Sequence, residues 1–303
     1  MFDINAARAF VEGNARPLGL AVYEYFLKGG SRARVIAELA RFQNPDGGFG
    51  HALEADNWNP ASTPIATNDA LITLYRTGAL DEAAARKMVS GIVRYLASHD
   101  SFDEAKRRWR FAVESNRDHP HAIWWEKQGD GILGFNPTVS LAAFMLCQRK
   151  NEPLHADIIR EAVRDLQGQT ELLGDTLKCY LLAHALLSAC GRTDIVDLGA
   201  LKTLLTARLD AAVCRDTSKY GVEYVPLPSD FFPGVYGDFV SQEMRGLIDA
   251  ELAALPRLQL SDGGFDISWQ WRTPYPAEFA QARTWWRARL TTDRLLFQRE
   301  YES

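Results

Sequence analysis

Two short stretches of this 303-residue chain decide the fold: LARFQNPDGGFG at residues 39–50 and LQLSDGGFD at residues 258–266. Each contains an apolar residue, a glutamine (Gln43 or Gln259), a short gap and then Asp-Gly-Gly-Phe. Paired glycines permit the positive φ of a tight turn. The aspartate can accept from the turn's own amides, and the glutamine can bond to backbone groups at a helix terminus. Both stretches are therefore expected to join one helix to the next, with their aspartates serving the turn rather than catalysis.

Helical periodicity covers most of the remaining sequence. Ser31 and Asp81 are each expected to cap the start of a helix. Further helices are expected over about Pro137–Arg149, Pro153–Leu166, Asp175–Ala189, Thr193–Ala212, Val240–Ala254 and Pro276–Gln298. Short turns between them predict antiparallel pairs. The alternating segment Arg108–Glu114 predicts a short β-ribbon inserted among the helices.

Helix pairs that are apolar on two sides can be buried by a solenoid or by a closed ring. No polar terminal repeat is evident, which favours the ring. The expected fold is therefore all-α: an α/α toroid of ten to twelve paired antiparallel helices around a central cavity. No linker or low-complexity tract interrupts residues 1–303, so one domain is expected.

Composition excludes several function classes. The net charge is 34 − 39 = −5, which argues against nucleic acid as a partner because phosphate binding needs a basic face. No apolar run approaches the roughly 20 residues of a membrane span, and the N-terminal sequence lacks the pattern of an export signal. The four cysteines, Cys147, Cys179, Cys190 and Cys214, lack metal-ligand spacing and are expected to be reduced. A cytoplasmic location is expected.

The two glutamine turns resemble the glutamine–aromatic repeat of squalene–hopene cyclases and the related repeat of protein prenyltransferase β-subunits. The resemblance implies an α/α toroid and an isoprenoid-like substrate class. The segments Asp56–Pro60, His121–Trp125, Phe135–Pro137 and Ser268–Trp271 look like those of bacterial prenyltransferase/squalene-cyclase-repeat proteins. Against the resemblance, the chain has no Asp-x-Asp-Asp motif, the closest match being Glu54-Ala-Asp56, and it does not reproduce the prenyltransferase Asp-Cys-His zinc set.

Two loops concentrate residues able to do acid–base chemistry. The first holds His51, Glu54 and Asp56; paired carboxyls in a partly dry site separate their pKa values, as proton transfer requires. The alternative is that these side chains only hold the loop together. The second loop holds His119 and His121, which suit an acid–base pair or, with an acid from the first loop, a metal; one packed and one solvated histidine is the alternative. Glu54, Asp56, His121 and His119 are the catalytic candidates.

Aromatic side chains supply candidate walls for a ligand, since they bind apolar chains, stabilise cations and stack on sugars. The ligand-binding candidates are His51, Trp58, Tyr75, Trp124, Trp125, Trp269 and Trp271. The tandem Trp285-Trp286 is interpreted as packing. Asp69 is interpreted as a helix-end charge favoured by the dipole, with a role in a pocket as the alternative.

Three functions remain open from the sequence. The first is an enzyme that uses acid–base chemistry on a small, apolar, isoprenoid-like ligand inside an aromatic-lined cavity. The second is a carbohydrate-active toroid, a glycoside hydrolase or polysaccharide lyase, which would also use paired carboxyls and aromatic platforms. The third is a binding or scaffold protein without catalysis. A small-molecule ligand, apolar or sugar-like, is the expected partner, and no cofactor or metal is expected.

Overall fold

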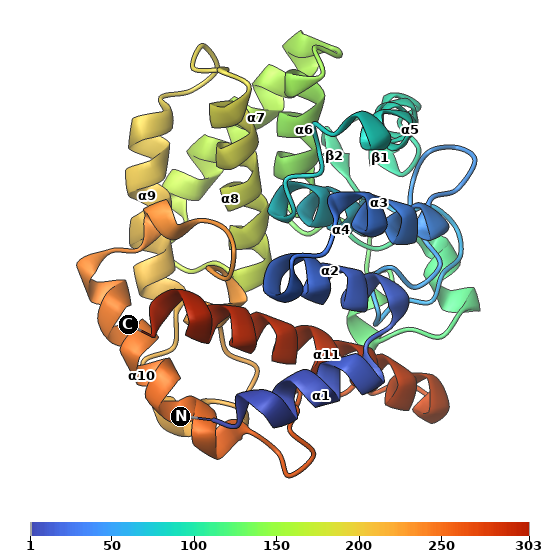
Figure 1. Cartoon of the computed structure of the whole chain (residues 1–303). Helices are drawn as coiled ribbons and strands as arrows, with labels where there is room; N and C mark the ends of the chain where they lie inside the picture. Colours follow the sequence, from blue (N-terminus) through green and yellow to red (C-terminus); the bar gives the residue numbers. More distant parts are fainter. Residues whose placement is uncertain (1, 303) are drawn as a thin grey trace. The chain divides into compact units, whose positions relative to one another are not determined.

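The structure is a computed structural model and describes residues 2–302. In that range the chain forms eleven α-helices and one two-stranded sheet (Figure 1). The helices are α1 (Ile4–Asn14), α2 (Pro17–Lys28), α3 (Arg32–Leu39), α4 (Pro64–Arg76), α5 (Arg86–Ala97), α6 (Thr138–Cys147), α7 (Glu152–Gly168), α8 (Gly174–Ala189), α9 (Leu198–Ala212), α10 (Gln242–Leu258) and α11 (Pro276–Tyr301). Strands β1 (Phe102–Asp103) and β2 (Arg108–Trp109) pair antiparallel. The predicted mostly helical fold is confirmed. Of the predicted ribbon Arg108–Glu114, only Arg108–Trp109 is a strand, and its partner Phe102–Asp103 precedes the predicted segment.

The described residues form two compact units. Unit 1 comprises residues 2–41, 74–84 and 213–302, and unit 2 comprises residues 42–73 and 85–212. Both units are assembled from segments that are distant in sequence. No single linker therefore separates them along the chain.

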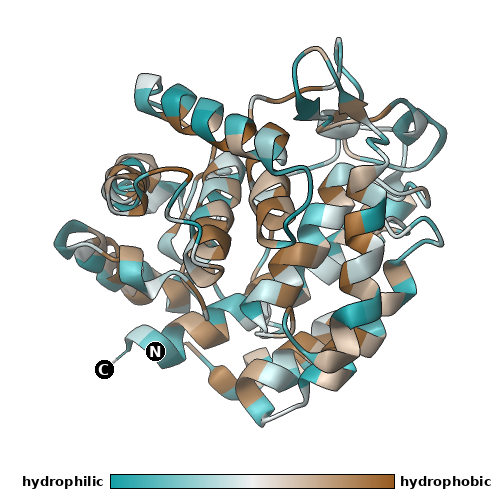
Figure 2. Cartoon of the chain, turned by 90° about the horizontal axis from the view of Figure 1, so that it is seen from above, coloured by the Kyte–Doolittle hydropathy of each residue, from teal (hydrophilic) through white to brown (hydrophobic). Residues whose placement is uncertain are grey.

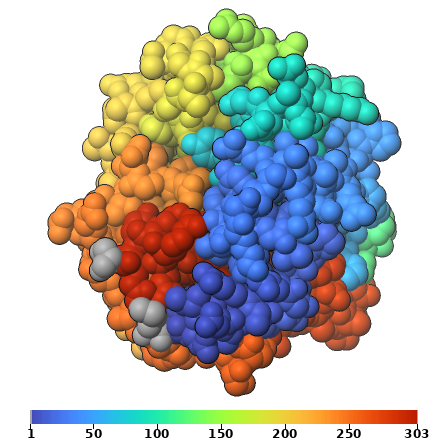
Figure 3. All heavy atoms as spheres, viewed as in Figure 1, coloured from blue at the N-terminus to red at the C-terminus, as the bar shows by residue number. Residues whose placement is uncertain are grey.

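In unit 1, the first helix packs beside the last. The helix α11 contacts α1, α2 and α10, and Figures 1 and 3 show α1 (blue) directly against α11 (red). The side chains buried between them come from four helices and from the second turn: Phe2, Ala7, Val11, Tyr23, Leu255, Phe265 and Leu295. Burial of this apolar surface is the main force that holds the chain ends together.

In unit 2, α6 is surrounded by other helices. It packs against α8, α7 and α5, while α9 packs on α8. Every side chain of α6 from Thr138 to Leu146 is buried, as expected for a helix that is apolar all round. Most other helices carry apolar residues on one face and polar residues on the other (Figure 2).

The two Asp-Gly-Gly-Phe turns are built by the same hydrogen bonds. Asp46 Oδ1 accepts from Gly48 N at 2.9 Å, and Asp262 Oδ1 accepts from Gly264 N at 3.1 Å. The glutamine side chains close the turns by donating to the carbonyls of Gly47 and Gly263, both at 2.9 Å. The predicted role of both aspartates as turn residues is confirmed.

Each turn is also seated against a neighbouring helix in the same way. The Gln43 amide donates to Met88 O on α5, and the Gln259 amide donates to Asp3 O at the start of α1. The first glycine of each turn lies against the helix backbone three residues further along. A Cβ on Gly47 would overlap the carbonyl of Gly91, and a Cβ on Gly263 would overlap the carbonyl of Ala6. Four residues beyond, Tyr95 and Phe10 close over the second glycine. Hence α1 holds in unit 1 the position that α5 holds in unit 2.

A threonine completes the equivalence between the turns. Phe49 N donates to Thr67 Oγ1 on α4 at 3.2 Å, and Phe265 N donates to Thr291 Oγ1 on α11 at 3.1 Å. Both threonine hydroxyls in turn donate to the carbonyl four residues earlier in their helices. Each turn is therefore bonded to the helix that follows it, α4 or α11, and to a second helix, α5 or α1.

Several boundaries differ from the predicted ones. Ser31 caps α3 as predicted, with its side chain accepting from Arg34 N. Asp81 does not cap α5, because a 3-10 turn at Ala83–Ala85 intervenes and α5 begins at Arg86. The helix predicted from Thr193 begins only at Leu198, where Asp197 accepts from Ala200 N.

The prediction of four reduced cysteines is wrong for two of them. Cys147, at the end of α6, forms a disulfide with Cys190, which follows the end of α8. Cys179 and Cys214 are free. The apolar pattern around these cysteines predicted burial, yet Cys147 is only partly buried and Cys190 is exposed. The pattern carried no information about which helix ends meet.

Candidate functional site

The two polar loops singled out from the sequence lie together in unit 2. An antiparallel bridge pairs Asn57 with His121. Beside it, Trp58 N donates to Pro120 O and Ala122 N donates to Asp56 O, both at 2.9 Å. Backbone pairing therefore places the carboxyl-bearing loop against the histidine-bearing loop.

An asparagine that sequence reasoning did not single out stabilises this junction. The buried Asn116 accepts from the side chains of Asn57 and Asn59 at 3.1 and 2.9 Å, and donates to Trp125 O at 2.9 Å. Side-chain amides with donors and acceptors can link several backbone segments at once. This amide cluster supports the reading that part of the first loop serves only to hold its own shape.

The central feature of the site is a hydrogen bond between two carboxyl groups. The side chain of Glu54, in the first loop, bonds to the side chain of Asp69 on α4. Glu54 Oε1 also accepts from Asp56 N at 3.1 Å. Two carboxylates cannot hydrogen-bond unless one carries a proton. Protonation of Glu54 would satisfy this contact, so Asp69 joins the candidate site in addition to being a helix-end charge.

The surroundings of Glu54 keep it protonated. Burial raises the pKa of Glu54 well above its ordinary value, and the negative charges of Asp69 and Asp56 raise it further. The amide of Asp56 opposes this shift by stabilising the carboxylate. Since the raising causes prevail, Glu54 remains an uncharged carboxylic acid well above the pH at which a glutamate usually ionises.

A buried polar network adjoins this acid pair. Asn68, next to Asp69 on α4, accepts from Ser140 Oγ at 2.5 Å and donates weakly to Cys179 Sγ at 3.8 Å. The Cys179 thiol donates to Asn136 Oδ1 at 3.3 Å. Burial, together with the nearby acids Asp175 and Asp69, raises the pKa of Cys179 to about 12. Cys179 is thus an inert thiol that fixes the amides rather than a nucleophile.

The candidate histidines differ in how far they are exposed. His121 is buried, with Nδ1 2.6 Å from His119 O and Nε2 4.0 Å from Glu126 Oε1. His119 is partly exposed, and His51 is exposed with Nε2 2.8 Å from Asn44 Oδ1. One packed histidine beside a more exposed one resembles the alternative given above to an acid–base or metal pair.

The aromatic candidates of unit 2 take different positions. Trp58 is partly buried, and its indole N–H donates to Ala55 O at 3.0 Å, between the two acids of the loop. Trp125 is buried and stacks on Phe111 with ring centroids 4.8 Å apart. Trp124 is 37% exposed. Of these three, Trp58 is the one whose hydrogen bond ties it to the segment between Glu54 and Asp56.

The aromatic candidates of unit 1 form two separate contacts. Tyr75 stacks on Tyr236 with centroids 6.2 Å apart. Trp269 is partly exposed and meets Trp286 edge-on, whereas Trp271 is buried. Trp269 and Trp271 therefore differ in how far they are exposed.

No group of three or more histidine, cysteine, aspartate or glutamate side chains within residues 2–302 could hold a metal ion. In the same range, no helix combines the length and the apolar character that crossing a membrane requires. Comparison of the chain with protein-family models, with curated proteins and with solved structures found no match in any of the three.

Proposed function

We propose that this protein is an acid–base enzyme in which Glu54 donates a proton to its ligand and Asp69 is the partner that shares this proton. The hydrogen bond between the two carboxyl groups carries the proposal. An acid works best when its pKa lies near the working pH, and a positioned acid contributes about 10²–10⁴-fold to a rate. Burial and the neighbouring negative charges raise the pKa of Glu54 in the direction of that range.

Asp56 has a supporting role in this proposal. Its charge favours the protonated form of Glu54, while its amide orients the Glu54 carboxyl. The other candidate, His121, has its Nδ1 2.6 Å from His119 O in the second loop. His121 therefore enters the proposal as a residue that shapes the second loop.

The raised pKa also limits the chemistry. Protonation of an alkene needs a carboxylic acid made unusually strong by its neighbours, whereas Glu54 is made weak. A weak acid suits a ligand with a basic oxygen, such as a carbonyl, an ether or an epoxide. The proposed ligand is therefore a small, largely apolar, isoprenoid-like molecule that carries such an oxygen.

The α/α toroid and its single domain are part of the same proposal. Its support is the equivalence of α1 and α5: the first helix occupies the place that a following helix would occupy after α11. A ring of helices requires its first member to follow its last in this way, whereas an open solenoid does not. A cytoplasmic location remains a prediction.

A carbohydrate-active enzyme is the second candidate, because a glycosidase acid also needs a raised pKa. Its second carboxyl must stand about 5–9.5 Å from the acid to leave room for the sugar or a water. Asp69 is hydrogen-bonded to Glu54 and is too close. Only Asp56 of the same loop could fill that position, so the geometry favours the first candidate over a sugar substrate.

The test is a screen of turnover in the wild type and in Glu54→Gln. Isoprenoid alcohols, aldehydes, epoxides and aryl glycosides are incubated with each protein, and products are detected by mass spectrometry. A loss of about 100-fold or more is expected for Glu54→Gln and for Asp69→Asn. Glu171→Gln, which changes an exposed glutamate of unit 2, is the matched control. Equal turnover in all four proteins, or none with any substrate, would contradict the proposal.

A further inference from the structure

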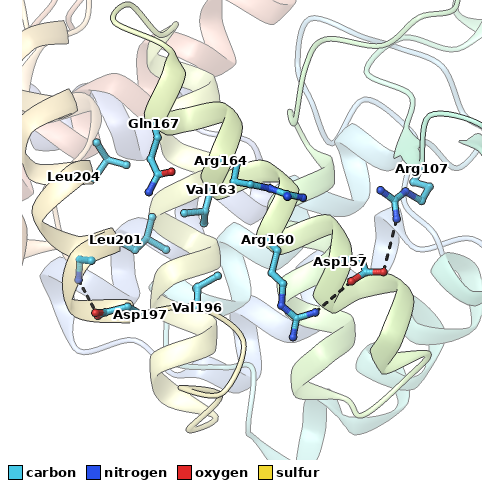
Figure 4. A pocket seen from close by; sticks show the side chains of 11 residues that line it. Arg107, Asp157, Arg160, Val163, Arg164, Gln167, Val196, Asp197, Leu201 and Leu204 are labelled. Atoms are coloured by element: carbon cyan, nitrogen blue, oxygen red, sulfur yellow. Dashed lines mark hydrogen bonds and ion pairs between the residues drawn. The ribbon is translucent and has the colours of Figure 1, made fainter.

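An open groove of about 780 Å³ lies between α7 and α9 of unit 2 (Figure 4). Its walls are one face of α7, the start of α9 with the turn before it, and the turn that leads to β2. The lining residues are Arg107, Asp157, Arg160, Val163, Arg164, Gln167, Val196, Asp197, Ala200, Leu201 and Leu204. The volume lies within the range of about 300–1,000 Å³ that holds small ligands.

One end of the groove is aliphatic. Val163 on α7 faces Val196, Leu201 and Leu204 from the α9 side, as Figure 4 shows. Val163, Val196 and Leu204 are partly exposed. Apolar surface left open between two helices is favourable to cover. This end can therefore receive an alkyl chain.

The other end is cationic, and one of its charges is not engaged. Arg160 pairs with Asp157 at 3.2 Å, and Arg107 pairs with Glu161 at 2.8 Å. Arg164, on the same face of α7, makes no hydrogen bond or ion pair with any residue of the described range 2–302. The carboxylate of Asp197 is bonded to Ala200 N at the start of α9. Arg164 thus offers a guanidinium to solvent beside the aliphatic end.

From this juxtaposition we propose that the groove binds a single-chain alkyl anion, with the chain along Val163, Val196 and Leu204 and the carboxylate or phosphate head on Arg164. The whole chain has a net charge of −5, whereas this groove is lined by three arginines and only two aspartates. The groove is therefore positive although the chain is negative. Guanidinium binds carboxylate and phosphate through paired N–H donors. This site is independent of Glu54, and its occupation does not depend on catalysis.

The probe is dodecanoate, titrated calorimetrically below its micelle concentration into the full chain. Binding to the wild type is expected, with weaker binding of butyrate, which lacks the chain, and of dodecyltrimethylammonium, which reverses the charge. Arg164→Ala is expected to weaken dodecanoate about tenfold, and Leu204→Ser is expected to weaken it as well. Arg86→Ala, at an exposed arginine where α5 begins, is the matched control and is expected to bind as the wild type does.

Three results would overturn the proposal. Butyrate binding as tightly as dodecanoate would reduce the site to a simple ion contact. Equal binding of the cationic and anionic probes would remove the role of Arg164. Binding of phosphatidylglycerol vesicles without binding of dodecanoate would mean a membrane surface instead of a free ligand. Thermal unfolding of each variant verifies that it is folded, and Leu204→Ser and Arg164→Ala act on different ends of the groove.

Discussion

Gln259 forms a two-way hydrogen bond with the backbone of Asp3, 256 positions earlier in the sequence. The side-chain oxygen of Gln259 accepts from Asp3 N at 2.7 Å, and its side-chain nitrogen donates to Asp3 O at 2.8 Å. The same nitrogen holds Gly263 O within the turn. One amide therefore joins the first helix to the segment that leads into the last.

Replacing Gln259 by alanine should destabilise unit 1. Gln259→Ala removes all three bonds, two of them exposed bonds to Asp3 and one a part-buried bond to Gly263 O, and the net loss should be about 1–3 kcal/mol. Equilibrium unfolding in urea measures the change in the free energy of unfolding. Gln43→Ala, which loses only the bonds to Gly47 and Met88, should cost no more than Gln259→Ala. A neutral Gln259→Ala would contradict the role assigned to this amide.

The glycine of the second turn should not tolerate a methyl group. Gly263 has φ of +90°, and a Cβ there would overlap the carbonyl of Ala6. Gly263→Ala should therefore lower the free energy of unfolding by about 1–3 kcal/mol. Gly13→Ala in α1, where nothing lies within 4 Å of the new Cβ, should be stabilising by about 0.5–1 kcal/mol. Thermal unfolding of both variants should show shifts of opposite sign.

Glu54 should make stability fall as the pH rises. Its pKa is raised in the folded state, so the stability gained from the protonated form is complete below the unfolded value near 4.5 and is lost as the pH rises through the folded pKa. Glu54→Gln keeps an uncharged side chain at every pH. The melting temperature of Glu54→Gln should therefore exceed that of the wild type at pH 8, and the difference should shrink at pH 5. A constant difference would indicate that Glu54 is ionised throughout.

His155 should make the free energy of unfolding fall as the pH is lowered. It is buried on α7, stacked on Trp109, and burial lowers its pKa. The unfolded state therefore binds a proton more readily, and stability falls as the pH drops below about 6.5. His155→Phe should flatten the loss of unfolding free energy between pH 7 and pH 5. Urea titrations at a series of pH values provide the measurement.

The disulfide between Cys147 and Cys190 should contribute measurably to stability. Closing the 43-residue separation restricts the unfolded chain, which is worth about 2–4 kcal/mol. The double variant Cys147→Ser, Cys190→Ser should lose that amount in urea unfolding. Thiol titration in denaturant should find Cys179 and Cys214 before reduction and all four cysteines after it. Four thiols in the unreduced protein would contradict the bond.

The sequence predicted the features that depend on nearby residues. Ser31 lies three residues before the amide it accepts from, and Asp46 and Asp262 lie two residues before theirs. Such short-range hydrogen bonds follow from residue type and spacing alone. The helices were found for the same reason, although Asp81 shows that a 3-10 turn can displace a predicted start.

The features that were missed depend on contacts between distant segments. Asp69 stands one turn into α4, where a dipole role is reasonable from sequence, and its meeting with Glu54 depends on the path of the intervening loop. The partner of Cys147 is 43 residues away, and its identity depends on how α6 packs on α8. Asn116 had no pattern of its own, although a buried asparagine between two polar loops is a reasonable place to look for a shared partner.

The positional equivalence of Thr67 and Thr291 extends to the residues two places further on. Asp69 follows the first threonine and Asp293 follows the second, yet Asp69 bonds to Glu54 while Asp293 pairs with Arg76 at 2.8 Å. The same aspartate position therefore faces an acid, Glu54, in unit 2 and a base, Arg76, in unit 1. A library of variants confined to residues 51–60, with every turn contact left intact, could exchange the chemical groups presented to α4 without redesigning a single helix.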